Sequence, residues 1–177
     1  MRKAGNIVLV GPMGSGKSAI GRVLATRLGR AFVDLDDSIE AHAGKVINAI
    51  FADEGEAGFR MRECSALAEA LMTPAQVIAT GGGAALDAGN RAAMRSAGTV
   101  VYLRVDSQEQ LRRVAGDSAR PLLDVADRGQ RLADLQAQRE PLYSEVADLA
   151  FDTSGHTPES AADALVAVLA TFKEPAR

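Results

Sequence analysis

The chain has 177 residues, of which 47% are hydrophobic and 24% charged, and its formal net charge at pH 7 is -3. These values are typical of one globular domain spanning residues 1–177, and the acidic balance argues against nucleic acid or a membrane as partner. A single cysteine excludes an intrachain disulfide, and two isolated histidines do not make a structural zinc site. Because the first residues contain neither a membrane-length apolar run nor a cleavage-like site, we expect a cytoplasmic protein.

A glycine-rich loop stands between the first predicted strand and the first predicted helix. Residues 6–10 predict a buried strand, because their apolar run is continuous rather than alternating. Residues 17–28 predict a helix that ends near Gly29. Between them, residues 11–18 read Gly-Pro-Met-Gly-Ser-Gly-Lys-Ser, which matches G-x-x-x-x-G-K-[ST] in the strand–loop–helix setting that this motif requires.

The loop has the composition of a phosphate-binding site. Its glycines let the backbone turn sharply and bring N–H groups close to phosphate oxygens, and the following helix adds its positive end. Lys17 would reach the β- and γ-phosphates of ATP, and Ser18 would hold Mg2+. The residues expected to contact the nucleotide here are Gly14, Ser15, Gly16, Lys17, Ser18 and Ala19. The alternative interpretation is a glycine-rich turn without a ligand.

Acidic residues close the second predicted strand, which covers residues 31–35. Asp34 and Asp36 are two positions apart and face the same way in an extended segment, so one could hold a Mg2+ water and the other accept a substrate hydroxyl. The alternative is that Asp36 caps the next helix while Asp34 is solvated; Asp37 is a second candidate cap. Residues 78–80 carry no acid to organise Mg2+, so Asp34 is the nearest candidate for that task.

The middle of the chain predicts two more helices and a strand. A short helix over residues 46–51 is separated from a longer one by a break at residues 53–56, and Thr73-Pro74 ends the longer helix. A third strand over residues 75–79 leads into Gly81-Gly82-Gly83. Three consecutive glycines favour close approach of a ligand to the backbone, and the alternative is a flexible strand-to-helix turn.

The second half of the chain continues the alternation of strands and helices. The expected elements are a helix over 86–96, a strand over 99–104, a helix over 106–114, an irregular lid over about 115–129, a helix over 130–143, a strand over 147–152 and a last helix from Thr157-Pro158. This pattern predicts an α/β fold in which five parallel strands are flanked by helices. Ligands bind such sheets at the carboxyl ends of the strands, where the loop, the acids and the triple glycine all fall.

Three arginines are further candidates for contact with an anion. Arg60 follows Phe59 near the start of the longer helix, Arg120 lies in the expected lid, and Arg139 lies in the helix that follows the lid. Any one of them alone is more often a surface residue or half of an ion pair. The lid arginine is the stronger candidate, because phosphoryl transfer needs mobile positive charge that closes on the transferred group.

Taken in order, these motifs resemble those of shikimate kinases. The resemblance spans nearly the whole chain and rests on residues 11–18, Asp34-Leu35-Asp36, Phe59-Arg60, the triple glycine, Arg120-Pro121-Leu122-Leu123 and Arg139-Glu140-Pro141-Leu142-Tyr143. It implies a three-layer sandwich of the P-loop NTPase type with a mobile lid. It also implies ATP-dependent phosphorylation of the 3-hydroxyl of shikimate, which gives shikimate 3-phosphate and ADP. The enzyme would use Mg2+ as cofactor and act as a monomer.

The resemblance places the acid substrate in a helical region over about residues 36–72 and on the later arginine. Arg60 and Arg139 would clamp the carboxylate of shikimate, which suits charge-assisted, forked hydrogen bonds. Asp36 and the backbone of Gly82 would bind the ring hydroxyls, with Asp36 as the base or orienting group.

The resemblance likewise assigns the nucleotide side. Lys17 and Arg120 would stabilise charge on the γ-phosphoryl group, Ser18 would bind Mg2+ directly, and Asp34 would contact it through water. Arg113 resembles the arginine that stacks on adenine. Residues 152–156 depart from the pattern of relatives that cover adenine after the last strand.

Two other functions fit part of this evidence. A related small-molecule kinase, such as a gluconate kinase, would use the same scaffold, and two arginines suit any small hydroxy acid. A nucleotide-binding regulator without catalysis would keep the loop, although Lys17, Ser18, Asp36, Arg60 and Arg139 together argue against that function.

Overall fold

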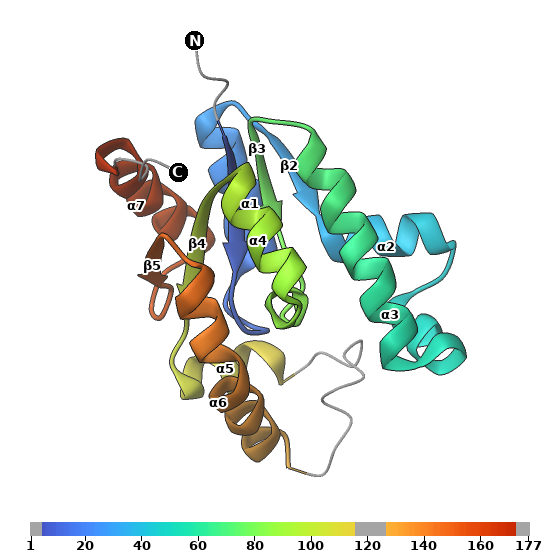
Figure 1. Ribbon diagram of the computed structural model, residues 1–177. Coiled ribbons are helices and arrows are strands. Elements are labelled where there is room, and N and C mark those ends of the chain that lie inside the picture. The colour runs from blue at the N-terminus through green and yellow to red at the C-terminus, as the bar shows by residue number, and fades with distance from the viewer. Residues whose placement is uncertain (1–4, 116–126, 173–177) are drawn as a thin grey trace.

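The computed structural model describes residues 5–115 and 127–172 of the chain. Its centre is a five-stranded parallel sheet with the strand order β2-β3-β1-β4-β5 (Figure 1). The strands are β1 (Asn6–Val10), β2 (Ala31–Asp34), β3 (Gln76–Ala79), β4 (Gly98–Arg104) and β5 (Leu149–Asp152). All five residues of β1 are buried, as expected for a central strand that is covered on both faces.

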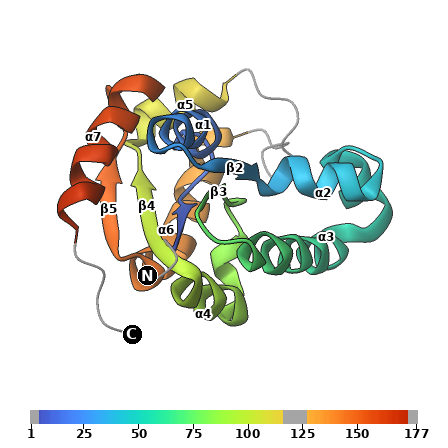
Figure 2. The ribbon, with the colours of Figure 1, turned by 90° about the horizontal axis from the view of Figure 1, so that it is seen from above.

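Helices cover both faces of this sheet, as the alternating pattern predicts. They are α1 (Lys17–Leu28), α2 (Leu35–Ala43), α3 (Ile47–Met72), α4 (Ala88–Ala97), α5 (Ser107–Val114), α6 (Arg128–Val146) and α7 (Pro158–Thr171), with a short 3-10 helix at Ala84–Leu86. One core packs α1 and α7 against one face of β1 and β4, and the other packs α2, α3, α4 and α6 against the opposite face (Figure 2). The expected three-layer α/β fold is therefore confirmed.

The start of α2 corrects one sequence-based expectation. Leu35 belongs to the helix rather than to the strand, and the N-cap is Asp34, whose carboxylate accepts a hydrogen bond from the Asp36 backbone N–H at 3.0 Å. The prediction that Asp36 or Asp37 caps this helix is therefore wrong. The reason is that β2 pairs with β3 as far as Asp34, so this residue keeps the extended backbone that an N-cap requires.

A kink at Gly55 divides α3, which confirms the break expected at residues 53–56. Gly55 has φ 69° and ψ -177°, which only glycine adopts readily. Glu54 spans the kink, since its carboxylate accepts hydrogen bonds from Arg62 at 2.7 and 3.0 Å and pairs with Lys45 at 3.1 Å. These contacts fix the direction of the long second part of α3.

The helix α6 begins earlier than the sequence suggests. Asp127 caps it by accepting a hydrogen bond from the Gln130 backbone N–H at 2.9 Å, so residues 128 and 129 belong to α6 and not to a lid. The rest of the expected lid, from 116 to 126, lies outside the described residues. Pro141 stays inside α6, which continues to Val146. Within the described ranges no helix is both long and apolar enough to cross a membrane.

Candidate active site

Loops that follow the first and third strands in sequence meet at the carboxyl edge of the sheet. A Cβ atom built on Gly82 would lie 3.7 Å from the backbone nitrogen of Met13 in the glycine-rich loop and 3.4 Å from Arg139 Nη1. A Cβ atom on Gly81 would lie 3.3 Å from Asp36 Oδ1. The structure thus places the loop, the triple glycine, Asp36 and Arg139 side by side, as the sequence predicts.

The glycine-rich loop has the backbone of an anion site. Gly11, Gly14 and Gly16 have φ values of 144°, 75° and 90°, conformations that other residues rarely adopt. Lys17 is only 8% exposed, and its Nζ atom donates to the carbonyl oxygens of Gly11 and Pro12 at 2.8 Å each. The ammonium group therefore lies over the loop at the positive end of α1, where phosphate binding is favoured.

Two predicted nucleotide contacts, Ser18 and Ala19, lie in the first turn of α1, where solvent or a ligand can reach them. Ser18 and Ala19 are exposed, whereas Ser15 is fully buried. The N-cap of α1 is Gly16, which provides no side-chain hydrogen bond to the first turn. The backbone N–H groups of this turn lack a side-chain cap, and an anion satisfies such groups well.

The guanidinium group of Arg113 on α5 is hydrogen-bonded to the glycine-rich loop and to two other segments. Nη1 donates to the Gly14 carbonyl at 3.1 Å, Nη2 to the Thr153 carbonyl at 2.9 Å, and Nε to the Glu109 carboxylate at 2.9 Å. These bonds use the edges of the guanidinium plane. The position beside the loop agrees with a nucleotide role, and stacking on adenine stays a prediction.

Arg60 and Glu63 on α3, beside the triple glycine, form an ion pair that begins a wall of the site, which Arg139 and Tyr143 continue. Arg60 Nη1 donates to Glu63 Oε2 at 2.7 Å, and Glu63 is only 1% exposed. Burial raises the pKa of the Glu63 carboxyl, and the charges of Arg60 and Arg139 oppose that shift. Of the two arginines, only Arg60 forms an ion pair with Glu63, and Arg139 acts on this carboxylate through its charge.

Arg139 completes this wall from α6. It is 5% exposed, and its neighbour Tyr143 is 1% exposed and donates its hydroxyl to the carbonyl oxygen of Gly82. Burial raises the pKa of Tyr143 to about 12, so the phenol is neutral and acts as a donor at ordinary pH. A fixed tyrosine beside the triple glycine holds this turn in place.

Unpaired polar atoms gather in this wall. In the described part of the chain, buried side-chain atoms without a hydrogen-bond partner include Arg60 Nε, Arg139 Nε and Glu63 Oε1. Buried polar groups are rarely left unpaired, so such a set indicates a polar ligand. Two guanidinium donors suit a carboxylate, and a carboxylate oxygen suits a hydroxyl.

Two of the three glycines, Gly81 and Gly83, leave no room for a Cβ atom beside the ion pair. A Cβ atom on Gly83 would lie 2.2 Å from Arg60 Nη1, and one on Gly81 would lie 2.4 Å from Glu63 Oε1. Any side chain at either position would displace the ion pair. Charged side chains of α3 therefore lie close to these glycines, and the predicted approach of a ligand to the same backbone stays a prediction.

Some predicted residues are not placed within this arrangement. Arg120 lies outside the described residues. Asp34 is half-buried and uses Oδ1 to cap α2, which leaves its contact with Mg2+ a prediction. Among the described residues, no group of three or more His, Cys, Asp and Glu side chains could hold a metal ion.

Glu63, Tyr143 and Thr153 were not predicted as site residues. The spacing of Arg60 and Glu63, three positions apart on a helix, is the usual signal of an ion pair and could have identified Glu63. Tyr143 ends the Arg139 motif but gives no local sign of its contact with Gly82. Thr153 had no sequence signal, because its partners are distant in the chain.

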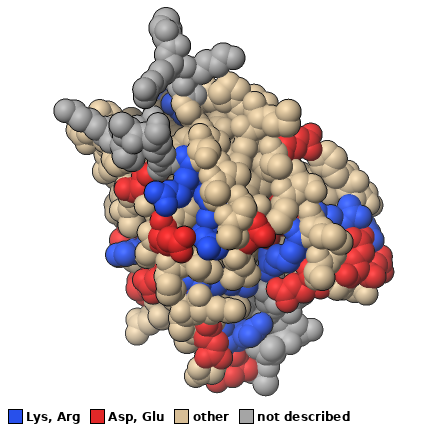
Figure 3. Space-filling view, viewed as in Figure 1, with Lys and Arg blue, Asp and Glu red and all other residues tan. Residues whose placement is uncertain are grey.

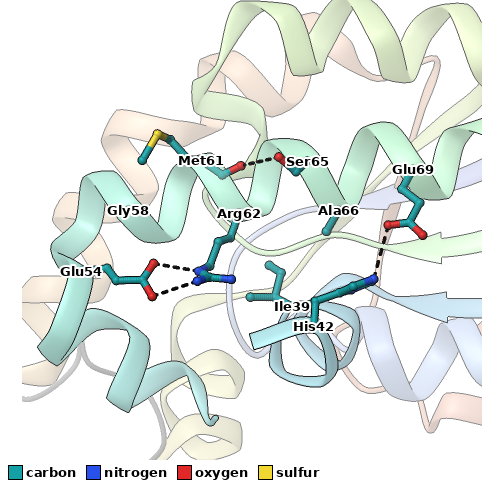
Figure 4. A pocket seen from close by; sticks show the side chains of 9 residues that line it. All are labelled: Ile39, His42, Glu54, Gly58, Met61, Arg62, Ser65, Ala66 and Glu69. Atoms are coloured by element: carbon teal, nitrogen blue, oxygen red, sulfur yellow. Dashed lines mark hydrogen bonds and ion pairs between the residues drawn. The ribbon is translucent and has the colours of Figure 1, made fainter. Parts of the chain in front are cut away.

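A hollow lies on another face of α3, between α3 and α2 (Figure 4). It measures about 370 Å3 and is lined by Ile39, His42, Glu54, Gly58, Met61, Arg62, Ser65, Ala66 and Glu69. Arg62 pairs with Glu54 in this hollow, and His42 Nε2 lies 3.5 Å from a Glu69 carboxylate oxygen. A much smaller hollow, of about 10 Å3, lies between the glycine-rich loop and α6, within the candidate site. It is lined by residues that include Met13, Arg139 and Tyr143.

Charges of both signs lie on the face of the molecule that Figure 3 shows. On the face shown in Figure 3, basic and acidic side chains are interspersed, and they gather over the kinked end of α3. There Lys45 pairs with Asp53 at 2.9 Å and with Glu54 at 3.1 Å.

Comparison with known proteins gives a family for this chain. The family model described as shikimate kinase matches residues 13–170. A shikimate kinase of Stenotrophomonas maltophilia strain K279a is 52% identical over 171 residues, which cover 97% of this chain and 95% of the relative. One from Xanthomonas campestris pv. campestris strain 8004 is 50% identical over 170 residues, covering 96% and 94%.

Solved structures give the same result. A shikimate kinase from Acinetobacter baumannii, solved in complex with shikimate, has a TM-score of 0.93 and 44% identity, and the match covers 96% of each chain. A gluconokinase from Sinorhizobium meliloti has a TM-score of 0.58 and 19% identity, covering 96% of this chain and 94% of its own. The second likeness shows a shared fold alone.

Proposed function

The chain belongs to the shikimate kinase family, and from this premise we propose how its own residues transfer the γ-phosphoryl group of ATP to shikimate. The activity is that of an ATP-dependent kinase that phosphorylates shikimate. The observation that carries the residue assignments is the set of unpaired atoms Arg60 Nε, Arg139 Nε and Glu63 Oε1 beside the glycine-rich loop. We assign the transfer to the 3-hydroxyl, giving shikimate 3-phosphate and ADP.

In this proposal Arg60 and Arg139 hold the carboxylate of shikimate. Their Nε atoms are buried and point to no partner in the described chain, so a carboxylate would satisfy both. Glu63 keeps Arg60 in place through the 2.7 Å ion pair. The acid end of the substrate is thereby fixed, and the far side of the ring is free to face the loop.

The reacting hydroxyl then lies between Asp36 and Lys17. Asp36 Oδ1 is beside Gly81, next to the turn that packs against the glycine-rich loop. A carboxylate at this place orients a hydroxyl and accepts its proton as the phosphoryl group is transferred. The backbone of Gly82 supplies a further polar contact for the ring.

Charge on the phosphoryl group is neutralised from the loop side. Lys17 lies over the loop, and we assign it to the γ-phosphate, together with Arg120 from the segment after α5. Gly14, Ser15, Gly16 and Ala19 supply backbone contacts to the phosphates. Because phosphoryl transfer depends mainly on positioning and charge neutralisation, these groups suffice for the chemistry.

Mg2+ would accompany ATP rather than occupy a protein cage. Mg2+ is usually held by one or two protein oxygens together with substrate phosphates and waters. The exposed hydroxyl of Ser18 and the carboxylate of Asp34 fit this limited donor set. When bound, the ion would neutralise charge between the β- and γ-phosphates.

We also propose that the chain acts as a monomer in the cytoplasm. Every side chain assigned above belongs to one chain, so the site needs no second copy. The single cysteine suits a reducing compartment. Arg113 would contact the adenine, for which its position beside Gly14 is the support.

An acceptor screen tests this function directly. ADP release is measured with shikimate, with gluconate and without an acceptor, and the Lys17→Ala variant serves as the inactive control. Release that depends on shikimate, with a 3-phosphate product identified by NMR, is expected. Turnover of gluconate but not shikimate would identify another small-molecule kinase, and ATP binding without release would identify a regulator.

A further inference from the structure

Thr153 joins three distant parts of the chain through one buried hydroxyl. It follows β5 and is 1% exposed. Its Oγ1 lies 3.0 Å from the carbonyl oxygen of Ser15, 2.9 Å from that of Arg104, and 3.1 Å from Arg113 Nη1. The glycine-rich loop, the end of β4 and α5 therefore meet at this atom.

Counting protons shows which of these bonds depends on the hydroxyl. A threonine hydroxyl donates one proton and accepts others, so it accepts from Arg113 and donates to one carbonyl oxygen. The Arg104 carbonyl already accepts the backbone N–H of Thr153 at 2.9 Å. The Ser15 carbonyl is therefore the acceptor that gains most from the hydroxyl proton.

The Ser15 carbonyl controls the direction of the next N–H group. The carbonyl of Ser15 and the N–H of Gly16 belong to one planar trans peptide, so they point in opposite directions. Holding the carbonyl towards Thr153 turns the N–H of Gly16 to the other side of the loop. Gly16 has φ 90°, and a glycine tolerates either orientation of this peptide, so sequence alone does not fix it.

We propose that Thr153 is a positioning residue for ATP, because its hydroxyl holds the Ser15–Gly16 peptide with its N–H group directed at the phosphates. The proposal rests on the assignment of the loop as the ATP site. Arg113 reinforces the arrangement, since the same Nη1 atom donates to Thr153 and to the Gly14 carbonyl at 3.1 Å. Loss of the hydroxyl would remove the hydrogen bond that holds the Ser15–Gly16 peptide and the hydrogen bond that Arg113 Nη1 donates to Thr153.

The test compares Thr153→Val with Thr153→Ser. Valine keeps the shape and removes the hydroxyl, whereas serine keeps the hydroxyl. Thr99→Val is the matched control, because Thr99 is also buried, at 5% exposure, and pairs with Ile7 at the end of the sheet away from the loop. The readouts are the Kd of ATP from calorimetry, the KM values of ATP and shikimate, and the Tm.

We expect Thr153→Val to weaken ATP binding about tenfold, which corresponds to ~1.4 kcal/mol, while the KM of shikimate changes less than about twofold. Thr153→Ser should bind ATP like the wild type, and Thr99→Val should lower the Tm without changing the Kd. If the valine variants do not fold, Thr153→Ala and Thr99→Ala make the same comparison.

Two results would overturn the proposal. One is an unchanged ATP Kd in Thr153→Val with a Tm loss like that of Thr99→Val, which would show a structural role only. The other is an equal rise in the KM of both substrates. Because the ATP Kd is measured without an acceptor, it decides the role of Thr153 even if shikimate turnover fails in the wild type.

Discussion

Replacing Arg139 by alanine tests the proposed carboxylate clamp. Arg139 is 5% exposed, and its Nε has no partner in the described chain. Replacing Arg139 by alanine therefore removes the hydrogen bonds that we assign to the substrate carboxylate. Hydrogen bonds to charged groups contribute about 1.5–3 kcal/mol each, and Arg60 remains to hold the acid. We therefore expect a loss of about 3 kcal/mol in the binding of shikimate, roughly a hundredfold in kcat/KM.

The assay is ADP release under varied shikimate and, separately, varied ATP. The KM of shikimate should rise strongly in Arg139→Ala while ATP binding stays within about twofold. Arg139→Lys should recover part of the loss, because it keeps the charge and loses the forked geometry. Arg95→Ala removes an exposed arginine of α4 as a control and should have no effect. Equal weakening of both substrates would refute the clamp.

Three further predictions address other parts of the site. Lys17→Ala should lower kcat by at least about a thousandfold, roughly 4 kcal/mol, in the same assay; near-normal turnover would contradict its place at the γ-phosphate. Gly83→Ala should raise the KM of shikimate at least about tenfold, because its Cβ would lie 2.2 Å from Arg60 Nη1, and an unchanged KM would mean that this contact is unimportant. Burial raises the pKa of Tyr143 from 10.0 to about 12, so the stability that this neutral phenol contributes is present below pH 10.0 and is lost as the pH rises towards about 12. Urea unfolding at pH 9 and pH 11.5 should show a smaller pH-dependent loss in Tyr143→Phe than in the wild type; equal losses would contradict this shift.

Local patterns in the sequence suffice for most of the fold. The buried strand over residues 6–10, the loop and the helix that ends at Gly29 are each specified by neighbouring residues, and the structure confirms them. The break near Gly55 is likewise local, since it needs one glycine with a positive φ. Alternation of such elements then leaves a parallel sheet as the simplest arrangement.

What the sequence could not decide depends on contacts between distant segments. Asp34 and Asp36 are equally good caps by residue type, and pairing of β2 with β3 at Asp34 and Ala79 selects the first. Thr153 and Ser15 are 138 positions apart in the sequence, so no local pattern predicts their contact. The same holds for the three unpaired atoms of the site, which only the folded chain brings together.

A crystal structure of this chain with shikimate bound measures the central arrangement most directly. We predict hydrogen bonds from Arg60 and Arg139 to the substrate carboxylate, with a ring hydroxyl beside Asp36 facing Lys17. A shikimate molecule whose carboxylate points away from both arginines, or which occupies the hollow between α2 and α3, would contradict it.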